Sequence, residues 1–283
     1  MEMDAVFFVS DLHGEKTRYS KLSKQILHDR PAGLFIGGDI TPHFARFVSE
    51  EDFFEDLLFP EFRRLKTLMG RDYPEVFIIL GNDDPRSEEM NLLQGEEEGL
   101  WHYMQGRKRS FGDFTVYGYA CIPPTPFRLK DWERYDVSRY VDPGCVPPTE
   151  GIRTVDTGED LEYCTIQQDL VDLAGEDDLA RAIFLFHAPP YRTNLDRAAL
   201  DGLKVEHVPL DTHVGSIAIQ RFIEERKPMI TFHGHVHESA RLTGYWFEKI
   251  GATFAFNAAI EEQDLAVIKL DLCQPEQAIR LIL

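Results

Sequence analysis

The sequence is poor in positive charge. Lysine and arginine number 30 against 49 aspartate and glutamate residues, which gives 283 residues a formal net charge of −19 at pH 7. Affinity for DNA or RNA depends largely on the neutralisation of backbone phosphates by lysine and arginine. So acidic a chain argues against nucleic acid as a partner, and an anionic ligand would need a local source of positive charge.

Long apolar runs are also absent. No stretch approaches the ~18 apolar residues of a membrane span, and MEMDAVFFVSDLHG at the amino terminus has no basic segment before its short apolar run. Cysteine is scarce and forms no C-x-x-C pair, with Cys121, Cys145, Cys164 and Cys273 widely spaced. This usage fits a reducing compartment and neither a disulfide framework nor a cysteine zinc site. We expect a soluble cytoplasmic protein without a membrane anchor, whose oligomeric state the sequence leaves open.

Short apolar runs that end in polar residues recur along the chain. Five of them are VFFVSD (6–11), LFIGGD (34–39), VFIILGND (76–83), AIFLFH (182–187) and MITFHGH (229–235). Each is typical of a buried strand with polar residues at its carboxyl end. The intervening segments predict helices at about 15–29, within 43–69 and 159–180, and at 215–226. The alternation predicts an α/β fold, and we favour a single domain over 1–283.

The pattern changes after residue 240. Four strand-like segments follow without helical spacers, at 241–250, 252–260, 264–272 and 278–283. They predict a second, largely antiparallel sheet that packs against the first, and therefore a layered α/β sandwich.

Residues 121–157 differ from the rest of the chain. Six prolines stand between Cys121 and Pro148, and apolar runs are few. This composition predicts an irregular, proline-rich insertion over the core. A lid or specificity loop and a solvated surface insertion are both open at this point.

Metal-binding residue types follow the five predicted strands. They are Asp11, His13, Asp39, Asn82, His187, His235 and His237. Ligands of open α/β sheets bind beyond the carboxyl ends of the strands, so we expect these seven side chains to converge. Asp11 and His13 can point to the same side of an extended turn, and the glycines of the GGD motif let the backbone approach an ion closely.

The donor types predict a cation site. Oxygen and imidazole ligands without thiolate suit Mn, Fe, Zn, Ni, Co or Mg, and two divalent ions explain seven donors better than one ion does. The Asp39 carboxylate could bridge ions ~3.5–4 Å apart, where a shared water becomes hydroxide near neutral pH and attacks phosphorus in line. Two such ions outweigh two carboxylates and a hydroxide, and would attract an anionic phosphate to an acidic protein.

Taken together, the motifs resemble the five sequence blocks of calcineurin-like metallophosphoesterases. The blocks are DLH (11–13), GGD (37–39), GND (81–83), His187 in HAPP, and GHVH (234–237), which match in order and spacing over nearly the whole chain. The resemblance implies a four-layer αββα sandwich of two central mixed sheets flanked by helices, with a dinuclear centre. It assigns one ion to Asp11, His13, Asp39 and His237, and the other to Asp39, Asn82, His187 and His235. The strings CIPPTPFRLKDWERYD (121–136) and HAPPYRTNLD also resemble an uncharacterised prokaryotic branch of the superfamily.

The third block departs from that family at Asp83. The family usually has histidine there, which contacts phosphate and helps to protonate the leaving oxygen. A carboxylate could act as a general acid, turn away from the substrate, or repel phosphate. The loss of the usual acid, and the diester-cleaving members with other residues there, favour a phosphodiester substrate, or an ester whose leaving group needs little protonation. His213 could supply a replacement contact, although a structural role is favoured for it.

Several other polar residues are predicted to be structural. His43 and His233 are favoured as structural by a small margin, and His28, His102 and His207 more clearly. Asp84 precedes Pro85 and is predicted to cap a helix, a role compatible with supporting the predicted ligands from behind.

We therefore expect a metal-dependent phosphoesterase that acts on a small phosphoester, with a phosphodiesterase favoured over a monoesterase. A non-catalytic metal-binding interaction protein on the same fold is a second hypothesis, which missing metal ligands would indicate. A metal-dependent hydrolase of an amide or carboxylic ester is a third, which activity screening would separate.

Overall fold

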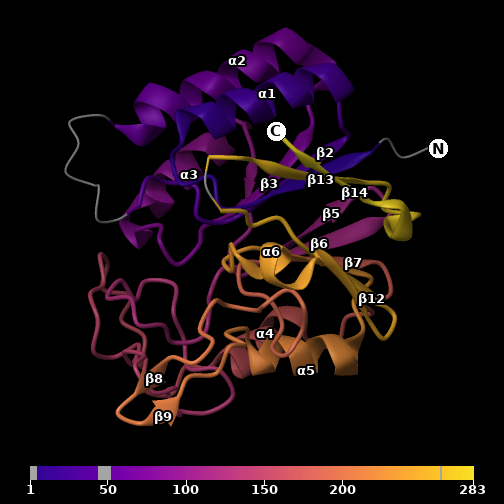
Figure 1. The fold of residues 1–283 in the computed structure, drawn as a ribbon. Helices are drawn as coiled ribbons and strands as arrows, with labels where there is room; N and C mark the ends of the chain where they lie inside the picture. The colour runs from indigo at the N-terminus through magenta and orange to yellow at the C-terminus, as the bar shows by residue number, and fades with distance from the viewer. Residues whose placement is uncertain (1–4, 44–51, 262) are drawn as a thin grey trace.

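Two six-stranded sheets lie face to face in the part of the chain that the computed structural model describes, residues 5–43, 52–261 and 263–283. Helices α1 (Lys16–Asp29) and α2 (Phe59–Met69) cover one sheet, and α4 (Ile166–Ala174) and α5 (Ile217–Arg226) cover the other. Four layers therefore follow one another from the top to the bottom of Figure 1. The αββα sandwich of two mixed sheets flanked by helices is confirmed.

The first sheet has the strand order β14-β13-β1-β2-β3-β4. Its strands are β1 (Val6–Val9), β2 (Gly33–Gly37), β3 (Glu75–Ile79), β4 (His102–Tyr103), β13 (Ala266–Leu270) and β14 (Ile279–Ile282). The four strands from β1 to β4 are parallel, whereas β13 pairs with β1 and β14 in antiparallel fashion. The carboxyl ends of β1, β2 and β3 consequently lie side by side.

The second sheet has the order β11-β12-β10-β7-β6-β5. Its strands are β5 (Arg107–Phe111), β6 (Phe114–Tyr119), β7 (Ala182–Phe186), β10 (Ile230–His233), β11 (Phe247–Ile250) and β12 (Thr253–Asn257). The inner pairs β6–β7, β7–β10 and β10–β12 are parallel, and only the edge strands β5 and β11 pair in antiparallel fashion.

The prediction that the last four strands form a sheet of their own is wrong. Strands β11 and β12 join the second sheet, β13 and β14 join the first, and the segment that begins at 241 starts within helix α6 (Ser239–Thr243). The predicted antiparallel character of the second sheet is wrong for the same reason. Alternation of side chains specifies which face of a strand is buried, but it does not specify the partner strand.

Phenylalanine rings join the two sheets. Phe8 of β1 stacks on Phe232 of β10 with ring centroids 4.4 Å apart, and Phe35 of β2 lies 5.1 Å from the same ring. Phe111 of β5 packs edge-on against Phe35 and Phe77. All five side chains are buried, so the inter-sheet layer is an aromatic core directly beneath the loops that follow β1, β2 and β10.

The predicted helices correspond to elements of the structure. Thr165 is the N-cap of α4 and Ser216 that of α5, and each of these hydroxyls accepts a backbone hydrogen bond from the first turn of its helix. The segment predicted within 43–69 forms a π-helical turn, η2 (Phe54–Leu58), and α2, while 44–51 lies outside the described residues. The remaining elements are η3 (Gly70–Asp72), η4 (Arg86–Glu88), α3 (Glu89–Glu97), β8 (Lys204–Val205), β9 (Val208–Pro209) and η5 (Pro275–Gln277).

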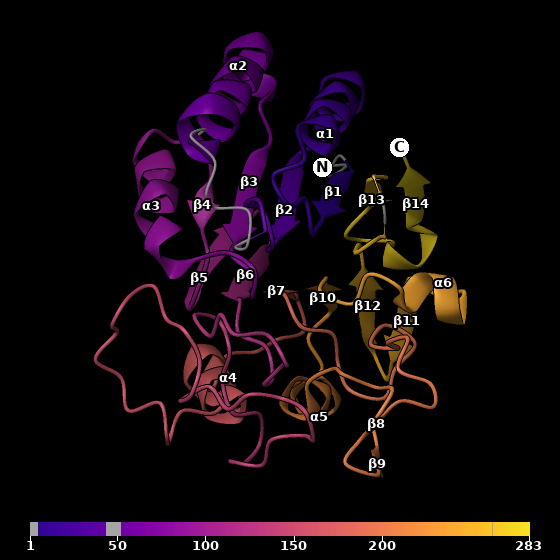
Figure 2. The ribbon, with the colours of Figure 1, turned by 60° about the vertical axis from the view of Figure 1, so that its left-hand side comes forward.

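Residues 120–165, all described, contain no named helix or strand and run beside α4 at the lower left of Figure 2. Buried groups nevertheless anchor this segment. The Trp132 side chain is fully buried, and Lys130 forms a buried ion pair with Glu133. The Asp136 carboxylate accepts hydrogen bonds from Ser216 Oγ (2.6 Å) and Ile217 N (2.7 Å) at the start of α5. The segment is therefore attached to the second sheet's helical layer.

No helix among the described residues combines the length and the apolar character that a bilayer span requires.

Lys269 of β13 ties α1 to the first sheet. Its Nζ donates to Asp29 Oδ2 at 2.9 Å, and this contact lowers the pKa of Asp29 to about 2. A pKa that is lower in the folded state than in the unfolded chain means that the pair stabilises the fold above about pH 4. That stabilisation is lost as the pH falls through 2.

Asp29→Asn should therefore lower the free energy of unfolding by about 1 kcal/mol at pH 7. The difference from the natural protein should shrink as the pH falls from 4 towards 2, as measured by urea unfolding across that range. Asp264→Asn is the control, because Asp264 is half-exposed and lies 4.0 Å from its lysine partner. A difference that stays constant with pH would contradict the assigned pairing.

Candidate metal centre

The candidate site lies where loops from both sheets meet. The first sheet supplies four of the predicted ligands, from the loops after β1, β2 and β3: Asp11, His13, Asp39 and Asn82. The second sheet supplies three, from the loops after β7 and β10: His187, His235 and His237. All seven residues come together across the junction of the two sheets.

The loops that carry these residues have an unusual backbone conformation. Asp11, His13, Asp39 and His235 have φ angles of 58°, 48°, 51° and 70°, in the left-handed region that costs a non-glycine residue ~1–3 kcal/mol. Backbone hydrogen bonds hold two of the loops in this form, from Asp11 N to Gly38 O (3.0 Å) and from His13 N to Asp39 O (2.8 Å). The loops after β1 and β2 thus constrain each other, and they bring the side chains of Asp11, His13 and Asp39 close together.

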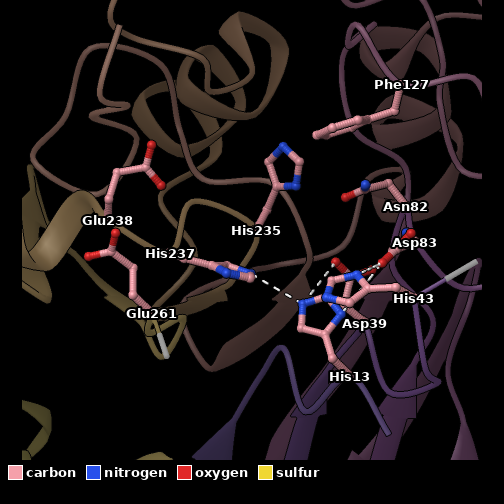
Figure 3. A pocket seen from close by; sticks show the side chains of 10 residues that line it. All are labelled: His13, Asp39, His43, Asn82, Asp83, Phe127, His235, His237, Glu238 and Glu261. Carbon is pink, nitrogen blue, oxygen red and sulfur yellow. Dashed lines mark hydrogen bonds and ion pairs between the residues drawn. The ribbon is translucent and has the colours of Figure 1, made fainter. Parts of the chain in front are cut away.

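One group of donor atoms surrounds His237. Its Nε2 lies 3.1 Å from Asp11 Oδ1 and 3.3 Å from His13 Nε2, and the two rings meet edge to face (Figure 3). One donor atom from each of these three residues lies within 4.8 Å of the other two. An oxygen and two ring nitrogens at this spacing fit a single cation.

A second group surrounds His187. Its Nε2 lies 3.0 Å from Asn82 Oδ1 and 3.4 Å from Asp39 Oδ2, and its Nδ1 donates to Gly37 O at 2.8 Å. That backbone contact leaves Nε2 as the atom that faces the ligands, as in many metal-binding histidines. The His235 ring packs against His187 with centroids 5.3 Å apart.

The electrostatics of the site favour cations. Burial opposes ionisation of Asp11 and Asp39, but His237 lowers the pKa of Asp11 to about 2, and His187 keeps the pKa of Asp39 well below its usual range. Against its own burial, Asp39 raises the pKa of His187 to about 9. A proton on His187 Nε2 can therefore be shared with the nearby oxygens of Asn82 and Asp39, and a divalent cation would displace this proton. Burial and the nearby His187 charge lower the pKa of His235 to about 4, so His235 is neutral and able to coordinate.

Asp84 fastens the loops after β2 and β3 to each other. Its buried carboxylate accepts hydrogen bonds from Ile40 N (3.1 Å), Thr41 N (2.8 Å), Thr41 Oγ1 (2.7 Å) and Gly81 N (2.8 Å). The predicted helix cap is wrong, because Pro85 occupies the N-cap position of η4 and no side-chain cap bond forms there. Asp84 instead supports the backbone on either side of two predicted ligands.

Two glycines make room for side chains of other motifs. A Cβ on Gly81 would lie 2.5 Å from Asp39 N and 2.7 Å from His187 Cε1, and one on Gly234 would lie 2.5 Å from Asp11 Oδ2. The sequence assigned a close approach of backbone to an ion to the glycines of the GGD motif. At Gly81 and Gly234, which belong to other motifs, glycine is required because side chains of predicted ligands pack directly against the backbone.

A cavity of about 400 Å³ opens over the donor groups. Its lining, drawn in Figure 3, consists of His13, Asp39, His43, Asn82, Asp83, Phe127, His235, His237, Glu238 and Glu261. Asp11 and His187 lie beneath it and are buried. Phe127 is the residue of the irregular segment 120–165 that lines the cavity.

Asp83 and His43 meet at the wall of this cavity. Asp83 Oδ2 pairs with His43 Nδ1 and lies 3.6 Å from His13 Nδ1, and the His43 ring stacks on the His13 ring with centroids 4.2 Å apart. Sequence reasoning favoured a structural role for His43. The sequence did offer one sign that His43 lies at the site, because His43 stands four residues after the predicted ligand Asp39, in the same loop.

Two other histidines make contacts that fit structural roles. His213 does not line the cavity, and its Nδ1 lies 2.7 Å from Asp196 Oδ1, in the loop after β7. The replacement contact suggested for His213 has no counterpart in this geometry. His233 donates to Ala188 O and accepts from Thr231 Oγ1, each at 2.8 Å, as the favoured structural role requires.

The chain belongs to the calcineurin-like phosphoesterase family, whose sequence pattern matches residues 5–239. Among solved structures, the protein TT1561 of Thermus thermophilus is 15% identical, with 99% of this chain and 98% of that chain covered and a TM-score of 0.57. A dimetal phosphatase from Danio rerio is 11% identical, with coverage of 100% and 99% and a TM-score of 0.53. At these identities the likeness shows the fold alone. No curated protein sequence matches the chain.

Gly81→Ala should weaken metal binding without a change in any ligand. The added methyl group would push against Asp39 and His187, and we expect ~10–100-fold lower metal affinity with ~1–3 kcal/mol lower stability. Calorimetric titration with Mn²⁺ and thermal unfolding of the metal-free protein measure the two effects. Gly202→Ala is the control, since Gly202 has a φ of 74° and no atom within 4 Å of an added Cβ. Equal metal affinities in the two variants would argue against this packing constraint.

Proposed function

We propose that the protein is a phosphoesterase that holds two divalent cations and hydrolyses phosphodiesters. The observation that supports this most strongly is the position of Asp39 between the two donor groups. Its Oδ2 lies 3.8 Å from His13 Nε2 and 3.4 Å from His187 Nε2. One carboxylate can therefore serve two cation sites, as a dinuclear centre requires.

Each proposed cation takes four side chains. The first would be held by Asp11, His13, Asp39 and His237, and the second by Asp39, Asn82, His187 and His235. This set of carboxylate, amide and imidazole donors suits Mn, Fe, Zn, Ni, Co or Mg. When bound, two such ions would lower the pKa of a water molecule and polarise the phosphorus–oxygen bonds of an ester. The chain's own part is to hold the donors rigidly and to orient the ester above them.

The charge of the cavity favours diesters over monoesters. Within the described residues, none of its ten lining side chains is lysine or arginine, and Glu238 and Glu261 stand on one side of it (Figure 3). A monoester dianion meets more repulsion from these carboxylates than a diester with one negative charge. This argument replaces the one based on a missing acid, because Asp83 is paired with His43.

Neither rival hypothesis has a specific observation in its favour. A non-catalytic binding protein would be indicated by missing ligands, but all seven predicted donors converge beneath a cavity of about 400 Å³. An amide or ester hydrolase would use similar chemistry, but membership of the phosphoesterase family supports phosphoesters. The cytoplasmic location and the small size of the substrate stay predictions.

Asp39→Ala should remove both activity and metal, because this carboxylate is shared by the two proposed sites. The natural protein should bind about two ions per chain and the variant fewer than one, as measured by elemental analysis after metal loading. Asp113→Ala, a substitution of an exposed aspartate outside the cavity, should leave the activity and the number of bound ions unchanged. A natural protein that binds a single ion after careful loading would contradict the dinuclear proposal and favour a mononuclear hydrolase.

Phe127→Ala tests whether the irregular segment shapes specificity. The ring faces the cavity and is 60% exposed, so its loss should remove ~1–2 kcal/mol of apolar contact with a substrate. We expect KM for aryl diesters to rise roughly 5–30-fold while metal content stays the same. Tyr140→Ala is the matched control, because Tyr140 is a similarly exposed ring of the same segment that does not line the cavity. Unchanged kinetics on every ester cleaved would leave Phe127 as a surface residue.

A further inference from the structure

The Phe127 ring differs from the other side chains of the cavity. Among the ten described residues that line the cavity, Phe127 is the one apolar residue, and it is 60% exposed. Its ring stands beside His235 and Asn82 (Figure 3). A ring in this position can pack against an apolar part of a ligand, provided that the chain holds the ring in place.

The loop that carries Phe127 is closed at its base. Ile122 N donates to Trp132 O at 2.9 Å, and Arg134 N donates to Ile122 O at 3.0 Å. Three prolines stand between Ile122 and Phe127, and each of them fixes one backbone φ angle. The loop therefore has little conformational freedom, although it contains no named helix or strand.

A buried polar cluster fills the inside of this loop. The Glu133 carboxylate accepts hydrogen bonds from Thr125 N (2.9 Å) and Thr125 Oγ1, and it pairs with Lys130 Nζ. Lys130 Nζ also donates to Thr125 O at 2.9 Å. All three residues are buried. A buried network whose members are hydrogen-bonded to one another holds its segment in one conformation.

The cluster reaches Phe127 through the Thr125 hydroxyl. Phe127 N donates to Thr125 Oγ1 at 3.1 Å, while the same oxygen donates to Glu133 Oε1. A threonine hydroxyl that accepts from the backbone two residues further on fixes a local turn. The backbone of Phe127 is therefore attached directly to the buried cluster.

The loop is also fastened to the segment that follows a predicted ligand. Asp131 Oδ2 accepts from Arg86 N at 2.8 Å, and the Arg86 guanidinium lies over the Trp132 ring, 4.9 Å from its centroid. Arg86 stands four residues after Asn82. These contacts connect the Phe127 loop to the loop that carries a predicted ligand.

We propose that Thr125, Lys130 and Glu133 are positioning residues that hold the Phe127 ring over the candidate metal centre, and that this ring packs against an aromatic ring on one alcohol group of the ester. The inference rests on the proposed function and names its substrate class, a diester with at least one aromatic alcohol group. The contact between two rings depends on their orientation, so a loosened loop would weaken it.

The test measures a ring preference by calorimetry in the manganese-loaded protein. It is the ratio of the dissociation constants of methyl methylphosphonate and methyl phenylphosphonate, two diester analogues with one negative charge that differ in the ring. The ratio should be about 5–30 in the natural protein and about 1 in Phe127→Ala. It should be about 3–10-fold lower in Thr125→Val than in the natural protein. Thr125→Val should add little in the Phe127→Ala background, because the two residues act together.

The kinetics should change in the same direction. KM for bis(4-nitrophenyl) phosphate should rise about 3–10-fold in Thr125→Val, with kcat and metal content within about twofold of the natural protein. This division between KM and kcat separates the loss of a substrate contact from damage to the metal centre.

Two controls match Thr125→Val. Thr125→Ser keeps the hydroxyl and should keep the ring preference. Thr157→Val removes a similar hydroxyl, which donates to Glu159 Oε2 and accepts from Glu159 N, two residues further on, but lies outside the cavity. Thr157→Val should leave affinities and kinetics unchanged.

A second variant serves if Thr125→Val does not fold, as thermal unfolding would show. Lys130→Met combined with Glu133→Leu removes both charges of the buried pair at once, so that no buried charge is left without its partner. It should lower the ring preference as Thr125→Val does.

Three results would overturn the assignment. A ring preference of about 1 in the natural protein would exclude the contact with an aromatic group. Equal losses of affinity for both analogues in Thr125→Val would show that the cluster does not position the ring. Additive effects of Thr125→Val and Phe127→Ala would show that Thr125 does not act through Phe127. If the natural protein hydrolyses no phosphoester, the proposed function fails, and the ring preference, which is measured without turnover, still decides the role of Phe127.

Discussion

The contact between the two sheets is the constraint on which the candidate site depends. Asp39 and Asn82 extend from one sheet and His187 from the other, yet their donor atoms lie 3.0–3.4 Å apart. That spacing depends on the distance and angle between the sheets as well as on the loops, and stacked phenylalanines such as Phe8 and Phe232 pack the sheets together. The aromatic core and the candidate metal centre are therefore coupled, because a change in the packing of the sheets also changes the spacing of the predicted ligands.

The sequence was sufficient where a property is local. Apolar runs followed by aspartate, histidine or asparagine identified the central strands β1, β2, β3, β7 and β10, together with the donor types at their ends. It was insufficient where a property depends on distant partners. The residues of β12 and β13 have similar strand patterns, yet β12 pairs with β10 in one sheet and β13 with β1 in the other. A strand joins whichever sheet has an unpaired edge beside it, and the strand's own side chains do not determine which edge that is.

The same distinction applies at the site. Asp84 is followed by proline, and the local pattern predicts a helix cap, but the backbone amides that it binds belong to Ile40 and Thr41. At Asp83 the sequence predicted the loss of the usual histidine and named His213 as a replacement contact, but it did not predict the neighbour that the structure shows. The fold sets His43 beside it from a loop about forty residues earlier. Two segments contribute to this wall of the cavity, and neither segment predicts the pair separately.

The pairing of β1 with β13 has a consequence for the order in which the protein folds. Val6 lies opposite Leu270, so during synthesis β1 waits for a strand that is made much later in the chain. Until then, one edge of β1 exposes unpaired amide and carbonyl groups beside apolar side chains, which is a template for association with other chains. The nascent polypeptide therefore has an interval in which this edge can associate with other chains, and the wide sequence separation of β1 and β13 makes the closure of the edge slow.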